Sequence, residues 1–133
     1  MGTRPPTLPV HDVHTIMAHV LERRAFTTRG SLHGQPLRPD GPALCMANGI
    51  ATAWRVRFET HAWANLTDYV VWHSFLPIAW HASGTDTWLM PPVHAFDTES
   101  MPTGKRRAFL LARDQIAIAL TRANMSIVSD ERD

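Results

Sequence analysis

The chain has few of the features that mark a specialised class of protein. It contains one cysteine, Cys45, in 133 residues, which excludes an internal disulfide and fits a reducing compartment. Thirteen basic residues against twelve acidic ones leave a net charge of +1, which gives no electrostatic reason to expect a nucleic acid or an acidic substrate. The first thirty residues contain no apolar stretch long enough for a signal peptide or a membrane span. We therefore expect a cytoplasmic protein with no role at a membrane.

Sequence motifs for metals and phosphates are also missing. The chain has no HExxH pair, no paired CxxC and no GxxxxGK[ST] phosphate loop. The sequence thus predicts no metal and no cofactor.

The rest of the chain is organised around residues 67–92, TDYVVWHSFLPIAWHASGTDTWLMPP. Residues 69–73 and 78–81 are rich in β-branched and aromatic side chains, and Pro77 separates the two runs. Ser83-Gly84 is a turn signal before a third run at residues 87–90. This pattern predicts a three-stranded antiparallel meander at about 68–91.

Three helices are expected, at about 11–24, 51–62 and 104–121. Apolar residues recur at helical spacing in the first and last of them. In the last helix we expect one buried line with Leu111 and Ile118 beside it; the line consists of Phe109, Ala112, Ile116 and Leu120.

Strands and helices in this order predict a single α+β domain over residues 1–133. We expect two layers, with the helices on one side of the sheet. Residues 1–9 and 126–133 are proline-rich or polar and are expected to be loose. Residues 26–28 could cover one edge of the meander as a fourth strand.

Trp72, Trp80 and Trp88 recur every eight residues along the expected strands. A three-residue loop ending at Gly84 would place Trp80 and Trp88 on one face of the sheet. The first turn leaves open whether Trp72 shares a face with Trp80 or with His81. The three tryptophans either cover the core, form a face that stacks a flat ligand, or belong to a partner interface.

Histidines on the expected strands are the candidates for catalysis. His73 and His81 lie on neighbouring strands, and Asp86 lies at a strand end, as do Asp68 and Asp97. A histidine beside a carboxylate can act as a general acid or base. The alternative is that these histidines decorate a half-exposed sheet face, and the strand register decides between the two.

Basic residues give the candidates for phosphate contacts. Lys105, Arg106 and Arg107 begin the last expected helix, with Arg113 further along, and we expect Arg106 and Arg107 to face solvent. Positive charge at a helix N-terminus opposes the helix dipole, a cost that is tolerated where the side chains touch phosphates. Arg29 lies in a flexible hydroxyl-rich segment that could also hold a phosphate. The cluster at 105–107 is equally explained as a solvated face, and the alternative for the Arg29 segment is a plain connecting loop.

Several stretches together resemble a group of small uncharacterised proteins of actinobacterial phages. The matching pieces are residues 24–34 (RAFTTRGSLHG), Trp54 with Phe58-Glu59, and residues 68–81 (DYVVWHSFLPIAWH). Members of the group carry a histidine before the last helix that residues 100–105 lack here. The resemblance implies a phage-encoded accessory protein in the host cytoplasm, and it implies no activity.

We therefore expect a binding module whose partner is a host or phage macromolecule. A protein partner fits the near-neutral charge better than a nucleic acid does. The alternative is a small hydrolase or nuclease that uses His73 or His81 with a nearby aspartate.

Overall fold

A computed structural model describes residues 4–37 and 49–129, so Cys45 lies outside the described part. The described residues form three helices and seven strands. In order they are β1 (Thr7–Leu8), α1 (Val13–Leu21), β2 (Thr27–Thr28), β3 (Leu32–Pro36), α2 (Thr52–Trp63), β4 (Thr67–His73), β5 (Leu76–Ala82), β6 (Thr87–Leu89), the 3-10 turn η1 (Val93–Ala95), α3 (Thr103–Arg122) and β7 (Ser126–Val128).

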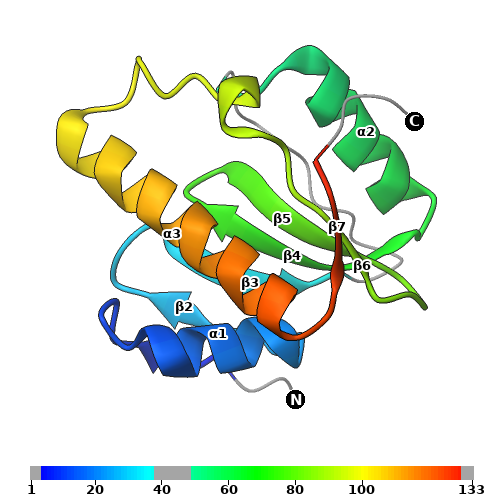
Figure 1. The fold of residues 1–133 in the computed structure, drawn as a ribbon, viewed down its shortest axis with the longest axis horizontal. Coiled ribbons are helices and arrows are strands. Elements are labelled where there is room, and N and C mark those ends of the chain that lie inside the picture. Colours follow the sequence, from blue (N-terminus) through cyan, green and yellow to red (C-terminus); the bar gives the residue numbers. More distant parts are fainter. Residues whose placement is uncertain (1–3, 38–48, 130–133) are drawn as a thin grey trace.

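The main sheet has five strands in the order β3-β4-β5-β6-β7. The first three pairings are antiparallel, whereas β7 runs parallel to β6 because α3 carries the chain back across the sheet (Figure 1). The α+β class is confirmed. The three expected strands are β4, β5 and β6, but β3 and β7 extend them on either side, so the sheet is mixed and is not a three-stranded meander.

Both expected loose termini contribute a short strand instead. Ser126–Val128 forms β7, and Thr7–Leu8 pairs in parallel with β2 in a separate two-stranded sheet. Residues 26–28 do not become the fourth strand, because β3 occupies that edge of β4. The bridge from Phe26 to Gly34 and a hydrogen bond from the Thr28 hydroxyl to the carbonyl of Leu32 join the two sheets. These segments are too short to show a period, and their pairing depends on distant partners.

Helices cover both faces of the sheet, so the expected arrangement with all helices on one side is wrong. Figure 1 shows α1 and α3 on one side of the sheet and α2 on the other. Phe58 of α2 packs edge-on against Trp72 and Trp80, with ring centroids 5.4 and 5.0 Å apart. Because every residue of β4 except Asp68 is buried, the strand needs a cover on each face.

The buried stripe of α3 is the one that its spacing predicts. Phe109, Ala112, Ile116 and Leu120 are buried, and Phe109 stacks edge-on against Phe96 at 4.9 Å. Leu111 and Ile118 are not covered beside them, since 56% and 51% of these two residues remain exposed. The exposed side of α3 therefore carries large apolar side chains.

Candidate functional site

The three tryptophans lie inside the protein and not on an aromatic surface. Trp72 and Trp80 are buried beneath α2, whereas Trp88 is buried on the other face of the sheet beside Tyr69 and His81. Trp88 pairs with His81 and Trp80 with Leu89, so the expectation that Trp80 and Trp88 share a face is wrong. Their indole N–H groups have no hydrogen-bond partner in the part of the chain that the structure describes. Burial removes all three from any stacking site for a ligand at the surface.

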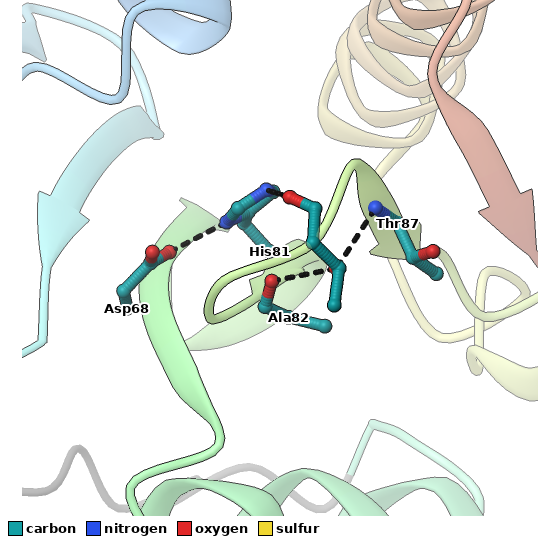
Figure 2. A network of polar contacts seen from close by, with 5 residues as sticks. Asp68, His81, Ala82 and Thr87 are labelled. Atoms are coloured by element: carbon teal, nitrogen blue, oxygen red, sulfur yellow. Dashed lines mark hydrogen bonds and ion pairs between the residues drawn. The ribbon is translucent and has the colours of Figure 1, made fainter.

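His81 is held by a network that uses both ring nitrogens (Figure 2). Nδ1 lies 2.7 Å from Oδ1 of Asp68, and Nε2 lies 2.8 Å from the carbonyl oxygen of Thr85. The Thr85 hydroxyl in turn donates to the carbonyl of Ala82 and accepts from the N–H of Thr87. A carboxylate and a carbonyl both accept, so the ring satisfies both when each nitrogen carries a proton. His81 thus fixes the turn between β5 and β6 and has no nitrogen left for catalysis.

His73 lies on the same face of the sheet but at the opposite end of β4. His81 pairs with Tyr69, four residues before His73, and the strand rise of about 3.3 Å per residue separates the two histidines by about 13 Å. Asp86 is exposed, lies in the connection between β5 and β6, and contacts neither ring through a hydrogen bond. The expected catalytic set of His73, His81 and Asp86 is therefore not assembled.

The surroundings of His73 keep its ring neutral. Only 3% of the residue is exposed, its ring packs edge-on against Phe109 at 5.5 Å, and its Nδ1 has no hydrogen-bond partner among the described residues. Burial, with smaller contributions from the charges of Lys105 and His33, lowers the pKa of His73 to about 4. No carboxylate contributes to that shift, so the ring has no acidic partner of the kind that a general base uses.

The expected basic cluster does not form one phosphate-binding surface. Arg106 is partly buried and donates from Nε to the carbonyl of Thr98 at 2.8 Å, so the expectation that it faces solvent is wrong. Arg113 donates to the carbonyl of Pro91 at 3.1 Å. Lys105 and Arg107 are exposed. Two of the four cations thus hold loop backbone in place.

Arg29 is exposed at some distance along the chain from that cluster. It lines a shallow hollow with the N-terminal segment, which consists of Thr7, Leu8, Pro9, Val10 and His11. Arg29 is the arginine among the described residues that line this hollow, and His11 lies beside it in the lining.

A groove between α1 and α3 is the surface feature that the sequence reading missed. Its deeper part is a cavity of about 440 Å³ between the two helices and the end of the sheet, and its shallower part is a hollow of about 680 Å³ along the C-terminal half of α3. Val13 and Gln115 line both parts, so the two are continuous. We call this surface the α1–α3 groove.

Apolar side chains dominate the α1–α3 groove. Val10 and Leu111 border the deeper part with 56% of each exposed, and Ile118 borders the shallower part with 51% exposed. Among the described residues, the lining contains no aspartate or glutamate. Its charged or titratable members are His11, His14, His73 and Arg122. The seven-residue spacing of Leu111 and Ile118, outside the buried line of α3, is the sequence signal that could have indicated this surface.

The described residues contain no group of three His, Cys, Asp or Glu side chains placed to hold a metal ion. None of the helices in the described part combines the length and apolar character needed to cross a bilayer. No family model, curated protein or solved structure matches the chain. The chemistry of the groove is therefore the basis for inferring function.

Proposed function

We propose that the protein is a small accessory protein of phage type that acts as a binding module for another protein through the α1–α3 groove. The observation that carries this proposal is the continuity of the groove together with three large apolar side chains on its borders, Val10, Leu111 and Ile118. A contiguous apolar surface of this kind is typical of interaction sites, whereas scattered apolar residues are ordinary. Burying it under a partner would remove that apolar area from water.

The groove fits an amphipathic helix from the partner. Two helices of this protein form its walls, and an apolar face of a third helix could lie between them with anchors one and two turns apart. Arg122 borders the shallower part, and no carboxylate lines either part among the described residues. We expect acidic residues on the partner helix beside its apolar face, because they would meet the guanidinium of Arg122.

A nucleic acid partner is less well supported. Arg106 and Arg113 are engaged with backbone carbonyls, and the net charge is only +1. Phosphate binding needs several free cations that converge on one surface. The alternative of a hydrolase or nuclease is also less well supported, since His81 is fully hydrogen-bonded and His73 has no carboxylate beside it.

The test is a capture experiment with matched surface variants. The protein, immobilised by a terminal tag, is used to capture partners from host lysate, and Leu111→Asp and Ile118→Asp are compared with Val56→Asp. Val56 lies on α2 and is 51% exposed, so it controls for adding a charge to an exposed apolar position. An interface anchor is worth at least about 1–2 kcal/mol, so each groove variant should bind the captured protein about tenfold or more weakly.

The control variant, Val56→Asp, shows whether a loss of partner capture is specific to the groove. Val56→Asp should capture the same partner as the unmodified protein does. A partner that all three variants retain equally, or that Val56→Asp alone loses, would place the interface outside the groove. Sedimentation of the purified protein would show whether a second copy of the chain occupies the surface.

A further inference from the structure

The deeper part of the α1–α3 groove differs from the rest because a buried polar side chain, His73, lies in its wall. Its volume of about 440 Å³ falls in the range of small-ligand sites, which is about 300–1,000 Å³. Most of the lining is apolar, from Val10, Val13, Ile16, Leu32 and Leu111. The imidazole of His73 belongs to the same lining. The site thus combines room for a ring with a single buried polar group at the sheet.

His73 has no hydrogen-bond partner among the described residues. No other described residue bonds to either ring nitrogen. Nδ1 is closed off from solvent and from the cavity, whereas Nε2 is not, so Nε2 is the ring nitrogen that a group in the cavity can reach. Buried polar groups in proteins are nearly always paired, so an unpaired one beside a cavity is a place where an incoming group can supply the missing bond. The buried indole N–H groups of the tryptophans are unpaired as well, but none of them lines this groove.

We propose that this cavity binds a phenol ring, the side chain of a tyrosine on the protein partner, with its hydroxyl hydrogen-bonded to the ring of His73. This inference rests on the proposed function and names the anchor that the partner would insert. A phenol hydroxyl both donates and accepts, so it matches a neutral imidazole in either tautomer. Tyrosine is also among the side chains that most often anchor protein interfaces.

Other anchors fit the cavity less well. An aliphatic side chain would fill the volume but leave the imidazole unpaired. A guanidinium would meet no carboxylate in the lining and would lie near the charge of Lys105, which already acts on His73. A carboxylate would lose its water on entering apolar walls, a large penalty without a fixed cation in the lining.

The test uses three small probes and needs no partner. NMR titrations of the isolated protein compare p-cresol, toluene and benzoate, which share a ring and differ in their polar group. We expect p-cresol to bind about 3- to 10-fold more tightly than toluene, the effect of one net hydrogen bond, and benzoate to bind most weakly. The imidazole nitrogens of His73 should shift on addition of p-cresol, which reports the contact without any substitution.

Two variants locate the site. His73→Phe keeps a ring of similar size and should bind p-cresol and toluene equally. Ala108→Met, at an exposed position of α3 that lines the cavity, should weaken both ligands by filling the entrance. Toluene binding as tightly as p-cresol to the unmodified protein, a phenol preference that survives His73→Phe, or benzoate binding most tightly would each overturn the assignment.

The same experiment separates this inference from the proposed function. Phenol binding at His73 is measured without a partner, whereas the groove variants at Leu111 and Ile118 test partner capture. Capture that depends on the groove, with no phenol preference, would overturn the tyrosine anchor alone. A phenol preference, combined with partner capture that the Leu111 and Ile118 variants do not weaken, would refute the protein interface at the groove. The cavity would then be a small-molecule site, and the assignment to a tyrosine side chain of a partner would be overturned.

Discussion

Replacing Gly34 by alanine should destabilise the protein because its sheet position leaves no room for a side chain. Gly34 lies in the middle of β3 opposite Val71. A methyl group there would overlap the hydroxyl of Tyr69 and lie 2.5 Å from a ring carbon of Phe26. Both neighbours are fully buried, and the Tyr69 hydroxyl donates to the carbonyl of Arg24 at 2.7 Å. Neither side chain can swing into solvent to make space.

The magnitude follows from these contacts. Overpacking a buried site costs about 1–3 kcal/mol, and displacing Tyr69 would also weaken a hydrogen bond worth about 1 kcal/mol. The smaller entropy of an alanine in the unfolded chain offsets about 0.4–1 kcal/mol. We therefore expect a net loss of about 1–3 kcal/mol in the free energy of unfolding, or a fall in Tm of roughly 5–10 °C for a chain of this size.

Gly104→Ala is the matched control for this measurement. Gly104 lies in the first turn of α3, and no atom would come within 4 Å of an added methyl group. The higher helix propensity of alanine should leave that variant as stable as the original or more stable by up to about 1 kcal/mol. Urea unfolding followed by tryptophan fluorescence measures both. If the two variants proved equally stable, the close approach of Gly34 to Phe26 and Tyr69 would be refuted.

Two further predictions concern polar side chains. The pKa of His73 is about 4 in the folded protein, against an ordinary value of 6.5. As the pH falls, the unfolded chain therefore takes up a proton at this residue before the folded protein does. The free energy of unfolding should fall by up to about 3 kcal/mol between about pH 6.5 and pH 4. Urea unfolding at pH 7 and pH 4.5 should show a smaller pH dependence of stability in His73→Phe than in the original protein. A smaller part of the dependence should remain, because burial also lowers the pKa of His33. An unchanged pH dependence in His73→Phe would contradict the assignment of the effect to His73. Arg106→Ala should lower the free energy of unfolding by about 1–2 kcal/mol, because it removes hydrogen bonds to loop carbonyls. Arg107→Ala should change this free energy by no more than about 0.5 kcal/mol. Equal effects of the two variants in thermal unfolding would show that the loop does not depend on Arg106.

The parts of the fold that the sequence could predict depend on local periodicity. The stripe of α1 and the buried line of α3 each repeat over several turns, so the pattern identifies both the helix and its inner face. Runs of β-branched and aromatic residues likewise identify β4 and β5. These elements carry their own signal, which no distant contact has to complete.

The parts that could not be predicted depend on register and on distant pairing. The register of β4 and β5 shifts between Val71 and Trp72, and a shift of one residue moves side chains to the other face. The connection between β5 and β6, residues 83–86, likewise has four residues and not the expected three, so Trp80 pairs with Leu89 and Trp88 lies on the opposite face. The contact between His81 and Asp68 also joins two neighbouring strands. The spacing of residues along the sequence alone therefore could not show that Asp68, and not Asp86, is the carboxylate beside His81. Strand β7 has three residues and exists only through its pairing with β6.

His73 and His81 show why the groove is the place to look for function. Both are buried on the same face of the sheet, yet His81 bonds through each nitrogen to its own chain and His73 bonds to none of the described residues. The unpaired imidazole lies in the cavity that Leu111 borders with most of its surface exposed. The unpaired imidazole and the exposed leucine each lower the stability of the isolated chain. An apolar residue at position 73 would remove the first cost, and a polar residue at position 111 would remove the second. A partner that covers Leu111 and bonds to His73 removes both costs at once, which neither substitution does.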